Sequence, residues 1–102
     1  MIIYIDIDET ICYYDSTRDY KLAQPYLHRI AKINRLYNEG NEIHYWTARG
    51  TLSNIDYYEL TYNQLKKWGA SFHSLKMGKP AYDLFIDDKN INSDYFFDNH
   101  IL

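Results

Sequence analysis

Two pairs of carboxylates stand directly after apolar runs of the chain. Asp6 and Asp8 close the first run, and Asp87 and Asp88 follow the apolar residues Leu84, Phe85 and Ile86. In an extended chain, residues at positions i and i+2 point to the same side, so Asp6 and Asp8 are expected to share one face. Carboxylates beside a buried strand are costly unless a cation or hydrogen bonds compensate them. Two neighbouring carboxylates can also divide labour, one as nucleophile and the other as general acid and base.

A hard cation is the compensating group that these residue types favour. Mg²⁺ prefers one or two carboxylates together with water and phosphate oxygens, and the chain has no His or Cys cluster of the kind that binds zinc. Two plainer interpretations stay open. Asp87 and Asp88 precede Lys89 and Asn90, which is ordinary turn composition. Asp8 could serve as a turn or capping residue, although capping would leave Asp6 unexplained.

Three further side chains are candidates for binding a phosphoryl group. Thr47 follows the short run Ile43–Trp46, where a hydroxyl and nearby backbone N–H groups can hold an oxygen. Arg49 could contact substrate or simply pair with a surface acid. Lys79 precedes Pro80, which biases it to an extended conformation. An ammonium placed beside carboxylates would neutralise charge on a transferring phosphoryl group, whereas a solvated surface lysine is the plain alternative.

The elements that must position these residues are predicted from hydrophobic periodicity and from helix start and stop signals. Ile2–Ile7 is expected to be a buried strand covered on both faces. Tyr13–Gln24 is polar and is expected to form a loop or flap. The remaining expected elements are helix Pro25–Glu39, strand Glu42–Trp46, a helix after Asp56 that buries Leu60, Leu65 and Trp68 and ends at Gly69, strand Ser71–Leu75, strand Asp83–Ile86, and a short helix within Asn92–Asn99.

This order of elements predicts an α/β fold with a doubly wound parallel sheet. Right-handed crossovers with short joints would place the strands side by side and the helices on the two faces. Open α/β sheets bind ligands outside the carboxyl ends of their strands. The candidate residues all follow or flank predicted strands, so we expect the carboxylates, Thr47, Arg49 and Lys79 to converge on one rim.

The composition limits the class of protein. A chain of 102 residues allows one domain, here residues 1–102, because a domain usually needs roughly 100 to 200 residues. The net charge of −3 favours neither a nucleic-acid nor a membrane partner, although a local basic patch stays possible. The single cysteine, Cys12, fits a reducing compartment, and neither a signal peptide nor an apolar run long enough to cross a membrane is present in the sequence, so a cytoplasmic location is expected.

The motifs together resemble the haloacid dehalogenase (HAD) superfamily. Asp6-Ile7-Asp8-Glu9-Thr10 resembles its DxDxT signature, Thr47 its second motif, Lys79 its third and Asp87-Asp88 its fourth, in the family's order over essentially the whole chain. Trp46–Arg49 and Gly78-Lys79-Pro80 are similar to small bacterial and phage-borne members, some connected with capsular or sugar-phosphate biosynthesis. The resemblance implies a Rossmann-like core.

The resemblance also implies a Mg²⁺-dependent phosphatase that works through an aspartyl-phosphate. Asp6 would attack phosphorus, and Asp8 would protonate the leaving oxygen and then activate water. Thr47 and Lys79 would hold the phosphoryl oxygens. The Mg²⁺ ligands would be Asp6, the backbone carbonyl of Asp8 and Asp87, with Asp88 bound directly or through water.

The two places where this family inserts a cap domain are too short here to contain one. Water exclusion would then depend on the Tyr13–Gln24 flap, on a large substrate, or on a neighbouring subunit in a homo-oligomer. The expected substrate is a small phosphorylated metabolite, such as a sugar phosphate. Two alternatives of another class are a phosphoacceptor module resembling a receiver domain, which needs an aspartate that Ser71–Leu75 does not supply, and a catalytically silent Mg²⁺-binding module.

Overall fold

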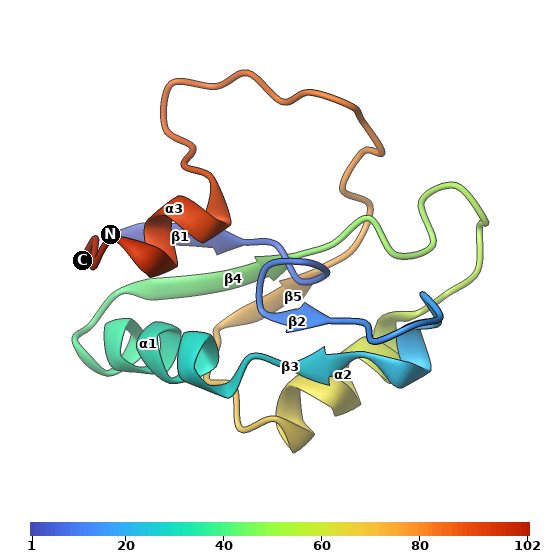
Figure 1. The fold of residues 1–102 in the computed structure, drawn as a ribbon, viewed down its shortest axis with the longest axis horizontal. Coiled ribbons are helices and arrows are strands. Elements are labelled where there is room, and N and C mark those ends of the chain that lie inside the picture. The colour runs from blue at the N-terminus through green and yellow to red at the C-terminus, as the bar shows by residue number, and fades with distance from the viewer.

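The computed structural model describes residues 1–102 and contains one parallel sheet of three strands. The strands are β1 (Ile2–Ile5), β4 (Glu42–Trp46) and β5 (Ser74–Lys76), in the order β1-β4-β5 (Figure 1). Ile2 is paired with Glu42, and His44 is paired with Ser74. The carboxyl ends of all three strands therefore lie at the same edge of the sheet, as the sequence predicts.

Two helices cover one face of this sheet. They are α1 (Leu27–Asn38) and α2 (Tyr58–Lys67), and each connects one strand to the next (Figure 1). Successive right-handed crossovers in one direction place both helices on the same side. The buried residues form one core between these layers: Ile5, Ile7, Ile11, Cys12, Ala23, Ile30, Ile33, Leu36, Ile43, Tyr45, Leu65, Ala70 and Leu75.

The segment between β1 and α1 is more ordered than the expected loop. β2 (Cys12–Tyr13) and β3 (Gln24–Pro25) pair in antiparallel fashion, and the single-turn 3₁₀ helix η1 (Tyr20–Leu22) lies between them. The prediction that Pro25 opens the helix is wrong, because Pro25 belongs to β3. The helix itself and the strand Glu42–Trp46 are confirmed.

The opposite face of the sheet is exposed at β1. Ile2 is 67% exposed and Tyr4 is 52% exposed, whereas Ile5 on the helix-covered side is buried. The prediction that the first strand is covered on both faces is therefore wrong. With α1 and α2 on the same side, the fold is a small α/β structure with a parallel three-stranded sheet and three α-helices.

The fourth strand expected at Asp83–Ile86 does not form. After β5 the chain leaves the body as a long connection and returns as α3 (Ser93–Asp98), which lies near β1 (Figure 1). Every residue from 80 to 92 is exposed. No further strand pairs with the outer side of β1, so it is an edge strand of the sheet.

None of the helices is long and apolar enough to cross a bilayer.

Candidate functional site

Asp6 stands directly after β1, at the carboxyl edge of the sheet. Its Oδ1 lies 3.5 Å from Nζ of Lys79, and its Oδ2 accepts a 3.5 Å hydrogen bond from the hydroxyl of Thr10. Burial raises the pKa of the Asp6 carboxyl, the nearby Lys79 ammonium opposes that rise, and the charge of Asp8 adds to it. A partly buried carboxylate with one ammonium beside it would be stabilised by a further cation.

Lys79 is held in place by the loop that follows β4. Its backbone N–H donates to the carbonyl of Thr47 at 3.1 Å, and its own carbonyl accepts from the hydroxyl of Thr51 at 2.7 Å. The ammonium lies 5.9 Å from the ring centre of Trp46 and 5.5 Å from that of Tyr82. Both flanking rings are within range of a cation–π interaction, so they help to fix the position of the charge.

Asp6 and Lys79 line an open cavity of about 200 Å³. Its other lining residues are Ala48, Pro80, Ala81 and Tyr82. The volume suits a phosphoryl group with a small part of its substrate rather than a drug-sized ligand, for which pockets are at least about 300 Å³. The cavity thus joins Asp6 and Lys79, which the sequence analysis expected to converge on one rim.

Asp8 has a different environment from Asp6. Arg49 grips it with two hydrogen bonds, 3.0 Å from Nε to Oδ2 and 2.8 Å from Nη2 to Oδ1. Burial acts to raise the pKa of Asp8, but the hydrogen bonds and charge of Arg49 outweigh it and hold that pKa below its ordinary value. The two neighbouring carboxyls are therefore driven in opposite directions, which is how paired acids acquire separate roles.

Arg49 is buried, with only 2% of its surface exposed. Besides Asp8 it donates to the hydroxyl of Thr61 at 3.1 Å and to Oε1 of Gln64 at 2.6 Å, both on α2, and its guanidinium lies 4.7 Å from the ring centre of Tyr20. Its donors are directed at protein groups, so the structure shows Arg49 paired with an acid, and contact with substrate stays a prediction. Its role here is to hold Asp8.

Tyr14 and Cys12 complete the surroundings of Asp8. The Tyr14 hydroxyl donates to Oδ1 of Asp8 at 2.5 Å, and the Cys12 thiol lies 3.4 Å from the same oxygen. Burial and the bond to Asp8 raise the pKa of Tyr14, so the phenol stays a proton donor. Cys12 is fully buried.

Thr47 does not face the cavity. It is 1% exposed, and its hydroxyl accepts a hydrogen bond from the backbone N–H of Arg49 at 3.1 Å. The hydroxyl thus shapes the turn that carries Arg49.

Asp87 and Asp88 lie on the exposed connection and do not join the rim. The one side-chain bond of this pair is local, from the backbone N–H of Asp88 to Oδ1 of Asp87 at 2.8 Å. No group of three or more His, Cys, Asp or Glu side chains is placed to hold a metal ion. The prediction that both acidic pairs converge within one chain is wrong, because the strand that would deliver the second pair is absent.

The residues of a single chain fit Mg²⁺ only in part. Asp6 is a partly desolvated carboxylate with one cation beside it, which is a suitable oxygen ligand. The Asp8 side chain is committed to Arg49, so only its backbone carbonyl is free for the role that the HAD resemblance assigns to it. The other carboxylates that the HAD resemblance assigns to the ion, Asp87 and Asp88, lie elsewhere.

Gln64 and Thr61 are the site residues that the sequence interpretation missed. Thr61 lies on the buried face of α2, one turn before Leu65, although a threonine is polar. A polar residue on the apolar face of a predicted helix was the one available signal, since buried polar groups need partners.

Comparisons with known proteins match the fold alone. No family model and no curated protein sequence matches this chain. A crystal structure of an MCSG target from Vibrio cholerae superposes with a TM-score of 0.82, over 93% of this chain and 85% of that one, at 24% sequence identity. At that identity the likeness establishes a shared α/β architecture and carries no activity with it.

Proposed function

We propose that this protein is a capless, Mg²⁺-dependent phosphatase of the HAD type that hydrolyses a phosphomonoester of a small metabolite. The observation that carries the proposal is the ion pair of Asp6 and Lys79. The two residues line one cavity of about 200 Å³ at the carboxyl edge of a parallel sheet. A carboxylate and an ammonium 3.5 Å apart supply a nucleophile and a site for a phosphoryl oxygen. The doubly wound HAD core is part of the proposal and needs a fourth strand beside β1.

The proposed chemistry assigns distinct roles to the chain's own groups. Asp6 attacks phosphorus and forms the aspartyl-phosphate, while Lys79 holds a phosphoryl oxygen. Asp8 protonates the leaving oxygen and then accepts a proton from the attacking water. The ion pair with Arg49 supports the second half of that role, because an ionised carboxylate is the form that a base requires.

Within one chain, Asp6 and the backbone carbonyl of Asp8 would hold Mg²⁺. Asp87 and Asp88, the other ligands that the HAD resemblance assigns, lie away from them in this structure. When bound, the ion would neutralise phosphoryl charge and orient the substrate.

The experiment that tests the function is phosphate release from sugar phosphates, nucleotides and an aryl phosphate, with Mg²⁺ and with EDTA. We expect turnover that needs the metal and falls at least about a thousandfold in Asp6→Asn, because a nucleophile acts as a unit with its partners. Asp98→Asn is the matched control, since this exposed carboxylate of α3 makes the same change away from the cavity. Full activity in Asp6→Asn would overturn the mechanism.

A catalytically silent metal-binding module is the second candidate, and one observation favours it. Both oxygens of Asp8 are engaged by Arg49, which opposes the acid half of its role. Mg²⁺ binding without turnover across the panel would support this candidate. The receiver-like alternative is not carried forward, because β5 contains no carboxylate to accept a phosphoryl group.

A further inference from the structure

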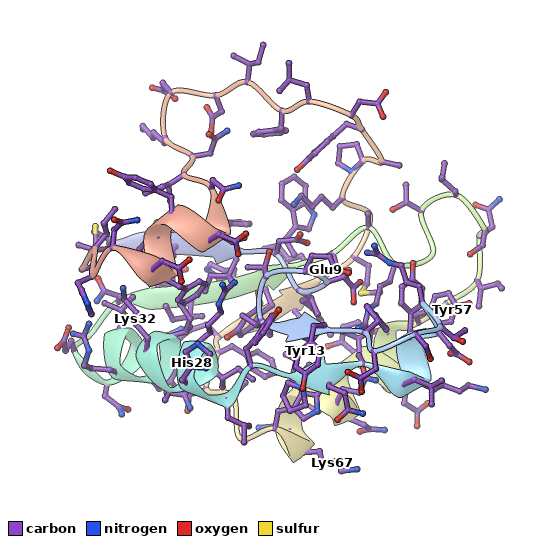
Figure 2. All side chains as sticks on the ribbon, viewed as in Figure 1. Glu9, Tyr13, His28, Lys32, Tyr57 and Lys67 are labelled. Carbon is purple, nitrogen blue, oxygen red and sulfur yellow. The ribbon has the colours of Figure 1, made fainter.

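The exposed connection 80–92, called the arm from here on, is held by the body at both ends. At its start Lys79 is bonded to Thr47 and Thr51. At its end α3 is fastened to α1: Arg29 bonds to Asp94 at 2.9 Å and Lys32 to the carbonyl of Phe96 at 3.3 Å. The arm therefore stands out between two fixed points, and all of its residues are exposed (Figure 2).

The arm has the composition of a buried strand and none of the burial. Leu84 is 75% exposed and Ile86 is 87% exposed, and Tyr82, Phe85 and Ile91 are also exposed. A contiguous apolar segment of this kind is unfavourable in water and usually marks an interaction surface. The carboxylates Asp87 and Asp88 follow it, as carboxylates follow β1.

β1 offers the complementary surface. Its inner edge pairs with β4, whereas no backbone hydrogen bond is made on its outer edge. Ile2 and Tyr4 are exposed beside that edge. An unpaired, apolar edge strand is a template for another strand.

The arm of the same chain cannot supply a parallel strand there. Placing Asp87 beside Asp6 would set Asp83 beside Ile2, at the far end of β1. The backbone of Lys79 is bonded to Thr47, which follows β4. Thr47 is five residues beyond Glu42, the partner of Ile2, and β4 lies on the inner side of β1. The required path is about 19 Å, from roughly 17 Å along the strands and roughly 10 Å across them. Four extended residues span at most about 14 Å.

Antiparallel pairing within one chain fails for a different reason. The arm runs from the carboxyl edge of the sheet back towards the start of β1, where α3 lies (Figure 1). An antiparallel strand in that direction would carry Asp87 and Asp88 away from Asp6. Neither arrangement within one chain completes the acidic rim.

A second copy related by a twofold axis meets both requirements. The arm runs antiparallel to β1 of its own chain. If the twofold axis makes β1 of the second copy antiparallel to β1 of the first, the arm of the first copy runs parallel to β1 of the second. A twofold contact is isologous, so each subunit gives its arm and receives the other. We propose that the protein forms an arm-exchanged dimer in which the 83–86 segment of each chain becomes the fourth strand beside the partner's β1, so that Asp87 and Asp88 complete the partner's Asp6 site.

This proposal rests on the proposed function for the use of the site, but the exchange itself is tested by cross-linking. The register with Asp87 beside Asp6 sets Phe85 beside Tyr4. Adjacent parallel strands lie about 4.8 Å apart, which is within the range that a disulfide bridges. The double variant Tyr4→Cys/Phe85→Cys is oxidised, and its mass is read on a denaturing, non-reducing gel.

Exchange predicts that the double variant is trapped as a covalent dimer of twice 12.3 kDa, and that a mixture of the two single variants forms the same band. Each single variant alone should stay monomeric on that gel, as should the wild type, whose Cys12 is buried. A double variant that closes on itself as a monomer would overturn the proposal. Ile3→Cys/Leu84→Cys is a second pair in the same register. Wild-type protein that remains monomeric at high concentration in light scattering would overturn the proposed dimer independently of any variant.

Mixing two inactive variants separates this proposal from the proposed function. Asp6→Asn keeps an intact arm and Asp87→Asn keeps an intact nucleophile, so exchange restores one complete site in each mixed dimer. Refolding them together should give about a quarter of the wild-type activity, since half of the dimers are mixed. If the wild type is active but the mixed variants stay inactive, the result counts against arm exchange and leaves the proposed function standing. Cross-linking in a protein without phosphatase activity would count against the function alone.

Discussion

Arg49 and Asp8 form a buried, bidentate ion pair that joins segments 41 residues apart in the chain. The pair connects the loop after β1 to the loop after β4, and through Gln64 it reaches α2. An arginine fork matches a carboxylate in geometry as well as in charge, so it fixes the orientation of Asp8 together with its ionisation. The rim of the sheet is therefore held by electrostatics as well as by packing.

Removing the fork should be strongly destabilising. Arg49→Met leaves the Asp8 carboxylate buried without its partner, and breaking a buried pair in this way costs about 3 to 5 kcal/mol. Urea unfolding monitored by circular dichroism measures the change. Arg35→Met is the control, because Arg35 pairs with Glu39 at 2.9 Å on the exposed surface, where a pair is worth about 1 kcal/mol or less. Equal losses in the two variants would contradict the structural importance of the Arg49 pair.

Tyr45→Phe should stabilise the protein. The Tyr45 hydroxyl is buried and has no hydrogen-bond partner, so removing it relieves an unsatisfied polar group worth about 1 kcal/mol or more. Burial also raises the pKa of Tyr45 above its ordinary value of 10.0. As the pH rises, the unfolded chain therefore releases this proton before the folded chain does. The free energy of unfolding of the wild type is unaffected by this group below pH 10 and falls above it.

The free energy of unfolding of wild type and Tyr45→Phe, measured from pH 8 to about pH 11, checks this prediction. We expect the wild type to lose stability more steeply above pH 10, since all other tyrosines are common to both proteins. A variant that is less stable at neutral pH would show that the hydroxyl has a partner.

Gly50→Ala should disrupt the loop that carries Arg49. Gly50 has a φ of +86°, and an added Cβ would lie 2.1 Å from the carbonyl oxygen of Ile55. Gly40→Ala is the matched control, with a φ of +97° and nothing within 4 Å. The control should lose about 1 to 2 kcal/mol from left-handed strain, and Gly50→Ala about 2 kcal/mol more from the clash. Thermal unfolding of both variants gives the comparison, and similar melting temperatures would contradict the close approach.

Asp8→Asn tests the division of roles between the two carboxylates. If Asp8 serves as acid and then as base, the amide should slow turnover and allow the aspartyl-phosphate on Asp6 to accumulate. Intact-mass spectrometry after acid quench would detect the added phosphoryl group, with Asp6→Asn/Asp8→Asn as the blank. Unchanged turnover in Asp8→Asn would remove it from the proposed mechanism.

Local sequence signals were sufficient for the elements of the body. The apolar run before Asp6, the strand Glu42–Trp46 and the two crossover helices all follow from short-range periodicity and from Gly punctuation. The same signals placed Asp6 and Lys79 at the carboxyl edge of a parallel sheet, where the structure brings them together. Strand order and crossover handedness leave little choice once those elements exist.

Only the tertiary structure decided the partners of the charged groups and the fate of the last apolar run. Arg49 could have faced solvent. Its burial depends on Gln64 and Thr61 of α2, a helix that the sequence predicts only from its apolar residues. Asp83–Ile86 has the composition of a strand, but strand formation also needs an accessible edge in the right direction. Four extended residues, from Lys79 to Asp83, are too few to reach the start of β1, so chain length prevents what composition favours.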